Sequence, residues 1–167
     1  SSSVDKKSGM TATEQLRAIY QAVGPLYEKR ERVFRDVEQQ LRLHGVYQLS
    51  VGELGTAEQK YLRHYFDENL APILSPQIID THHPFPHLQN KVIHVGARLR
   101  RKGKEVLALI PVPAAAPDVV FLPGSDVRCI PTEQILLSRL SNVFSTYTVE
   151  EATAFCVTRN ADINPED

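Results

Sequence analysis

The sequence is short of cysteine and has no long apolar run. Its two cysteines, Cys129 and Cys156, form no CxxC pair, whereas a disulfide scaffold needs more cysteines in a shorter chain. We therefore expect both to be small buried hydrophobic residues. No apolar run approaches the roughly 18–20 residues of a membrane-spanning helix. The polar start, SSSVDKKSGM, is not typical of a signal peptide, and we expect residues 1–8 to be a disordered lead-in.

An excess of charge of either sign is also lacking. Lys and Arg total 19 and Asp and Glu total 20, so bulk charge does not favour binding to nucleic acid or to an anionic membrane. The 167 residues, 42% of them hydrophobic, fit one soluble domain with its own core. Neither a P-loop (GxxxxGK), nor GxSxG, nor HExxH occurs, so three common catalytic motifs are missing.

Helical periodicity predicts four helices. Gly24-Pro25 interrupts the first pattern, because proline lacks the backbone donor, and Gly45 is suited to end the second helix. Thr56 is placed to cap the third helix, with Leu62, Phe66 and Leu70 facing inward. The four predicted helices are about 11–23, 25–44, 56–74 and 131–143.

The second half of the chain has strand-like runs. In 93–99 apolar and polar residues alternate, which indicates a strand with one wet face. A polar turn at 100–104 between two such runs predicts an antiparallel hairpin. The fold class is therefore α+β, with N-terminal helices followed by a mainly antiparallel sheet with one inserted helix, and helices covering one face. The predicted strands are 46–49, 93–99, 105–112, 119–122, 127–130 and 154–159.

Residues 81–90, THHPFPHLQN, hold three of the six histidines. His82, His83 and His87 could be metal ligands, a catalytic cluster or part of a stiff loop. A zinc site needs three or four convergent ligands, and no Cys or Glu lies nearby. The prolines at 84 and 86 favour extended backbone, which separates the rings. We favour a stiff connection from helices into sheet, with a metal-dependent hydrolase as the weakest alternative.

Two further segments are rich in polar groups. The basic turn, defined here as Arg98, Arg100, Arg101, Lys102 and Lys104, is either a solvated hairpin tip or an anchor for phosphate oxygens. The segment 157–162, VTRNAD, follows an apolar strand and could form a polar network at the end of that strand.

Several of these segments resemble one family. Four segments are similar to segments of the head domain of long-chain polyphosphate kinases and follow one another in the same order as in that family: GMTATEQL (9–16), PILSP (72–76), HPFP (83–86) and VTRNAD (157–162). The resemblance implies a head domain over 9–163, with a helical part about 11–74, a sheet part about 77–163, and 164–167 as a truncated tail.

The family resemblance also implies a function. Such kinases transfer the γ-phosphate of ATP to polyphosphate through a phosphohistidine, with Mg²⁺, on C-terminal domains that this chain does not match. No catalytic or metal-binding residue is therefore carried over, and we expect an isolated scaffold and subunit-interface domain that is inactive alone. The motif positions expected to have structural or interface roles are His83, Pro84, Phe85, Pro86, Thr158, Arg159, Asn160 and Asp162.

The expected partners and cofactors follow from the same resemblance. This chain should need no cofactor, whereas ATP and Mg²⁺ are implied for the parent enzyme, meaning the full-length kinase. Its partners would be the remaining domains of the parent and other copies of it, in the cytoplasm, with membrane association of the parent left open. A stand-alone module that binds polyphosphate or another polyanion through residues 98–104 is the alternative function.

Overall fold

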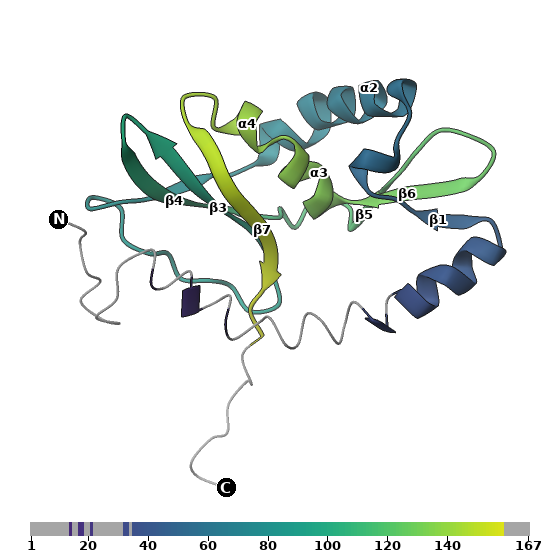
Figure 1. The fold of residues 1–167 in the computed structure, drawn as a ribbon, viewed down its shortest axis with the longest axis horizontal. Coiled ribbons are helices and arrows are strands. Elements are labelled where there is room, and N and C mark those ends of the chain that lie inside the picture. The colour runs from purple at the N-terminus through teal and green to yellow at the C-terminus, as the bar shows by residue number, and fades with distance from the viewer. Residues whose placement is uncertain (1–13, 15–16, 19–20, 22–31, 34, 159–167) are drawn as a thin grey trace, which may run out of the picture.

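The computed structural model describes residues 14, 17–18, 21, 32–33 and 35–158 (Figure 1). Helical residues 35–43 lead through a turn into strand β1 (Val46–Gln48). Gly45 has a φ of 74°, a left-handed conformation that glycine adopts without steric cost, so the predicted end of this helix is confirmed. The predicted break at Gly24-Pro25 lies outside the described residues.

The next helical stretch changes its geometry along its length. Helix α2 (Thr56–Tyr65) continues as a π-helical turn, η2 (Phe66–Leu70), and a 3₁₀ turn, η3 (Ala71–Ile73), and the 3₁₀ turn η1 (Val51–Glu53) precedes it. Its inward face buries Leu62, Phe66 and Leu70, as the sequence predicted. The predicted cap was wrong, because the chain enters the helix one residue earlier and Gly55 is the N-cap.

The larger sheet is antiparallel throughout and has the strand order β2-β4-β3-β7. The predicted hairpin is confirmed as β3 and β4. The last strand starts at Thr148 and ends at Cys156, so its predicted bounds, 154–159, were wrong. A bulge in β7 shifts its register with β3 between Arg98 and Leu99. The bulge interrupts the alternation of apolar and polar residues in the first half of β7, so the sequence pattern did not reveal that half as a strand. The strands are β2 (Gln77–Ile79), β3 (Ile93–Arg101), β4 (Lys104–Pro111) and β7 (Thr148–Cys156).

A second, smaller sheet has the order β1-β6-β5 and was not predicted. The predicted strands at 119–122 and 127–130 are β5 (Val119–Phe121) and β6 (Val127–Pro131), which form an antiparallel pair, while β1 lies parallel to β6. The α+β class is confirmed.

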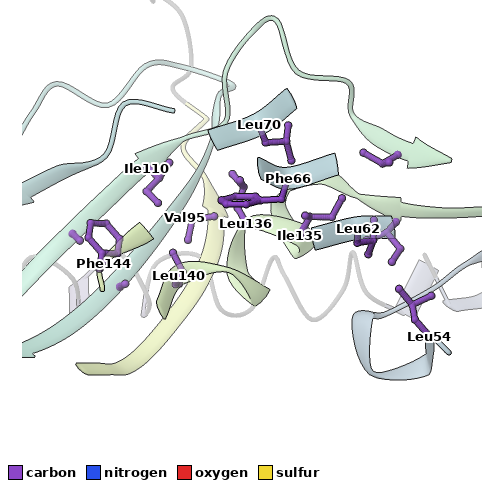
Figure 2. Close-up of a cluster of buried hydrophobic side chains, with 14 of the residues drawn as sticks. Leu54, Leu62, Phe66, Leu70, Val95, Ile110, Ile135, Leu136, Leu140 and Phe144 are labelled. Atoms are coloured by element: carbon purple, nitrogen blue, oxygen red, sulfur yellow. The ribbon is translucent and has the colours of Figure 1, made fainter. Parts of the chain in front are cut away.

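Most of the core lies between the larger sheet and the helices. Figure 1 shows α3 (Thr132–Ser138) and α4 (Leu140–Val143) on one face of β3, β4 and β7, with α2 beyond them. The predicted fourth helix is thus confirmed but divided at Arg139, whose φ and ψ are −112° and 8°. We call the buried apolar cluster on this side the main core, and Figure 2 shows its centre, including Phe66, Val95, Ile110, Leu136 and Leu140.

Candidate functional site

The histidine-rich segment joins β2 to β3, two strands of one sheet. The prediction that it leads from helices into sheet was therefore wrong, because the short strand β2 precedes it. The carboxylate of Asp80 organises its first turn. Oδ1 of Asp80 accepts hydrogen bonds from the backbone N–H groups of His82, at 2.8 Å, and His83, at 2.9 Å. The backbone N–H of Asp80 donates to the carbonyl of His83, at 3.1 Å, so the turn closes on itself.

The imidazole of His83 is directed by the same carboxylate. Its Nδ1 lies 3.0 Å from Oδ1 of Asp80, while 71% of the side chain is exposed. Hydrogen bonds from the His82 backbone and from the side chain and backbone of His83 lower the pKa of Asp80, because they stabilise the carboxylate. In the described part of the chain no three His, Cys, Asp or Glu side chains converge as a metal site would require. The structure thus gives the metal-dependent hydrolase no support.

The rest of this segment covers the face of the larger sheet opposite the helices. Phe85 packs against a second apolar cluster, which we call the loop-side cluster. Val157, the first residue of VTRNAD, packs against the same cluster, and its carbonyl accepts from the N–H of Lys91 at 2.8 Å. The loop-side cluster consists of Ile79, Leu88, Leu107, Leu109 and Phe155.

Two of the segments that resemble the kinase family thus meet on this face. Phe85 and Pro86 of HPFP are half-buried, whereas His83, Pro84 and Thr158 are exposed. The remaining motif positions, Arg159, Asn160 and Asp162, lie outside the described residues, so their roles stay predictions.

His94 is a notable residue of this face that the sequence did not single out. It is only 4% exposed, its Nδ1 lies 2.9 Å from the carbonyl of Val92, and its ring stacks on Phe155 with centroids 5.6 Å apart. Burial lowers the pKa of His94, because the neutral ring is easier to desolvate. The alternating pattern placed His94 correctly opposite the helices, but it could not show that a loop covers it there.

Two arginines of the basic turn form part of an ion-pair ladder across three strands. Arg98 lies 3.4 Å from Glu105 and 3.4 Å from Glu151. Arg100 lies 2.7 Å from Glu105 and 2.8 Å from Glu150. The bulge in β7 makes the ladder possible, since it lets the consecutive residues Glu150 and Glu151 each reach an arginine of β3.

The other three cations of the basic turn lie at the end of the hairpin. Lys102 and Gly103 form the turn with φ of 49° and 74°, and Arg101 pairs with Lys104 across the strands. The guanidinium carbon of Arg101 is 5.6 Å from the ring centroid of Tyr147. The cations of the basic turn therefore lie in two different environments. Arg98 and Arg100 belong to the ion-pair ladder, where glutamates neutralise them. The remaining cations lie in the segment Arg101–Lys104, which we call the hairpin tip.

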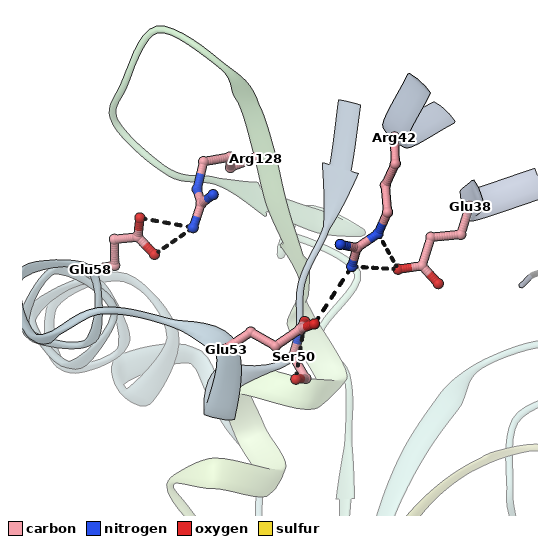
Figure 3. A network of polar contacts seen from close by, with 6 residues as sticks. All are labelled: Glu38, Arg42, Ser50, Glu53, Glu58 and Arg128. Carbon is pink, nitrogen blue, oxygen red and sulfur yellow. Dashed lines mark hydrogen bonds and ion pairs between the residues drawn. The ribbon is translucent and has the colours of Figure 1, made fainter. Parts of the chain in front are cut away.

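A separate polar network ties the N-terminal helix to the rest of the domain (Figure 3). Arg42 contacts Glu38 at 3.0 Å and Glu53 at 3.6 Å, and the pKa of Arg42 is raised, chiefly by Glu38. Arg128 of β6 pairs with Glu58 of α2 at 3.0 Å. We interpret these contacts as structural ion pairs, and the one between Arg128 and Glu58 joins elements far apart in sequence.

The comparisons with known proteins decide the family. Residues 57–167 match the family model described as the polyphosphate kinase middle domain. The chain belongs to the polyphosphate kinase family. This confirms the resemblance found from the sequence motifs, and the match begins one residue into α2, after the N-terminal helix and β1.

Relatives in this family are much longer than the chain. A polyphosphate kinase of Exiguobacterium sibiricum is 34% identical over 164 residues, which cover 95% of this chain and 23% of that protein. A polyphosphate kinase of Synechocystis is 31% identical, with 95% and 24% covered. The crystal structure of the Porphyromonas gingivalis polyphosphate kinase superposes with a TM-score of 0.74 at 26% identity, over 90% of this chain and 24% of that one. The chain thus spans about a quarter of the length of these relatives.

None of the helices in the described part is long and apolar enough to cross a membrane.

Proposed function

We propose that this chain is the head domain of a polyphosphate kinase that transfers the γ-phosphate of ATP to polyphosphate through a phosphohistidine. The observation that carries this proposal is the match of residues 57–167 to the family model of the middle domain. The chain spans about a quarter of the length of its relatives. In the parent enzyme this domain acts as scaffold and subunit interface, while phosphoryl transfer takes place on other domains.

The surroundings of three of the six histidines support this division of roles. A histidine that accepts a phosphoryl group needs a free ring nitrogen facing the donor and cations around the transferred phosphate. His83 and His64 instead lie beside the carboxylates of Asp80, at 3.0 Å, and Glu68, at 3.3 Å. Both side chains are also largely exposed to solvent, 71% for His83 and 69% for His64, rather than enclosed with a donor. His94 is only 4% exposed, so its ring is not accessible from the solvent.

Exposed apolar side chains support the interface role. The N-terminal helix carries three exposed apolar residues spaced four apart. Their exposed fractions are 60% for Val33, 51% for Val37 and 43% for Leu41. On the smaller sheet, Phe121 and Val127 are 61% and 46% exposed. Apolar groups gathered on a surface mark contacts with other protein. The remaining domains of the parent, or another subunit, would cover them.

ATP and Mg²⁺ belong to the parent enzyme in this proposal. Mg²⁺ binds through a few carboxylates together with the phosphates of its substrate. The described part of the chain has no group of three or more His, Cys, Asp or Glu side chains that could hold a metal ion. Following the family resemblance, we place the site of the magnesium ion on other domains of a cytoplasmic enzyme.

An assay with labelled ATP tests the scaffold role. Incubated with γ-labelled ATP and Mg²⁺, this chain is expected to make no labelled polymer, whereas a full-length polyphosphate kinase assayed beside it does. Appreciable labelled polymer from this chain alone would contradict the proposal.

The cations at 98–104 favour a second candidate, a stand-alone polyanion-binding module. Such a module needs no other domain, so the chain alone would bind polyphosphate as tightly as a full-length enzyme does. Much weaker binding by the chain would exclude the module and leave the scaffold role standing.

A further inference from the structure

The hairpin tip concentrates positive charge at a cost to the fold. Arg101 and Lys104 lie directly opposite each other, and like charges in that position destabilise a strand pair. Lys102 adopts a φ of 49°, a conformation that tight hairpin turns usually give to Asn, Asp or Gly. Within the part of the chain that the structure describes, no carboxylate lies within ion-pair distance of these three cations. A ligand that supplies negative charge would offset the repulsion between these cations.

Arg101 is held in place before any ligand arrives. Its guanidinium lies over the ring of Tyr147, and this ring is half-buried and packs against the main core. A guanidinium that lies over an aromatic ring can still donate its N–H groups to other acceptors. The contact with Tyr147 therefore restricts the Arg101 side chain while leaving it able to bind an anion.

The ladder separates this tip from the rest of the basic turn. An anion approaching Arg98 or Arg100 must displace Glu105, Glu150 or Glu151, which already accept from these arginines. The three cations of the tip have no such competitor among the described residues. Binding of an anion is thus favoured at the tip and opposed at the ladder.

We propose that Arg101, Lys102 and Lys104 form a binding site for a chain of linked phosphates, with Tyr147 positioning Arg101. A guanidinium grips phosphate oxygens with two parallel hydrogen bonds, and each lysine adds a mobile point charge. Three adjacent cations match successive phosphates of one chain. The choice of phosphate as the anion rests on the proposed function. The triphosphate of ATP and inorganic polyphosphate share this chemistry.

Titration calorimetry of this chain with tripolyphosphate, with ATP and with long-chain polyphosphate tests the site. Replacing Arg101, Lys102 and Lys104 together by Gln should weaken binding of tripolyphosphate by about tenfold or more and reduce its dependence on salt. Tyr147→Leu, which removes the stacking partner, should weaken it by about two- to fivefold. Equal affinities for tripolyphosphate and ATP are expected, since the phosphates are recognised; much tighter binding of ATP would overturn the proposal.

Two control variants separate a site from a general effect of charge. Replacing Arg32, Lys60 and Arg63, three exposed cations on helices, by Gln removes the same net charge and should change affinity by less than about twofold. The charge-neutral pair Arg98→Gln with Glu151→Gln should likewise have little effect. Equal losses in the tip and helix variants, or no loss in the tip variant, would refute the site. Neither result would touch the scaffold role, which the labelled-ATP assay tests separately.

Discussion

The two ends of one sheet face are built from the same three strands and stabilised in opposite ways. At one end, Phe155 and Leu109 of the loop-side cluster are buried under the segment that contains HPFP. At the other end, Arg98 and Arg100 pair with glutamates in partly exposed positions. Burial of apolar area contributes kilocalories per side chain, whereas partly exposed ion pairs contribute little. The covered end should therefore determine stability, and the charged end should be free to interact with other molecules.

The largest expected effect is at the covered end. Phe155→Ala should lower the free energy of unfolding by about 3–5 kcal/mol, because it leaves a cavity beneath the loop. Phe121→Ala, at a residue 61% exposed, is the matched control and should change it by about 0.5 kcal/mol or less. Urea unfolding of both variants measures the difference. Equal losses would show that the loop does not cover this face in solution.

An intermediate effect is expected where the strand makes room for that phenylalanine. A Cβ at position 96 would lie 3.1 Å from Cε1 of Phe155, so Gly96→Ala crowds the cluster. Overpacking costs about 1–3 kcal/mol, against a gain of about 0.5–1 kcal/mol from reduced backbone entropy, so we expect a net loss. Gly52→Ala, with nothing within 4 Å, is the control.

A double-mutant cycle sharpens this test. If the ring of Phe155 causes the crowding, the loss from Gly96→Ala should shrink in a Phe155→Leu background. Additive losses in the two variants would mean that some other contact is responsible.

The smallest effect is expected in the ladder. Arg100→Gln should cost about 0.2–1 kcal/mol at low salt, because its pairs with Glu105 and Glu150 are partly exposed and screened. The loss should diminish in high salt, because salt already weakens these ion pairs in the unsubstituted chain. Unfolding at two salt concentrations checks this. A large loss that salt does not change would mean that the ladder contributes as much to stability as the covered end.

Local patterns in the sequence predicted the elements whose signals lie within them. The alternation in 93–99 and the glycine-containing turn after it predicted the β3–β4 hairpin, and Gly45 marked the end of a helix. These features depend on side-chain periodicity and on backbone freedom at single residues. The motif at 83–86 also pointed to the correct family.

The remaining features depend on contacts between distant segments. The parallel pairing of β1 with β6 joins Val46 to Val127, and no local pattern specifies such a partner. The bulge at Glu150 hid the start of β7, and the loop over His94 turned a predicted wet face into a partly covered one. The basic turn could be recognised from sequence, but its division into ladder and tip required the glutamates of β7 to be placed.

The most direct test of the central claim, that this chain is part of a phosphoryl-transfer enzyme without being its catalytic part, is to look for the covalent intermediate. After incubation of this chain and of a full-length polyphosphate kinase with γ-labelled ATP and Mg²⁺, acid-labile label on protein should appear only in the full-length enzyme. A phosphorylated histidine on this chain, at His83 or at any other of its six, would contradict the claim.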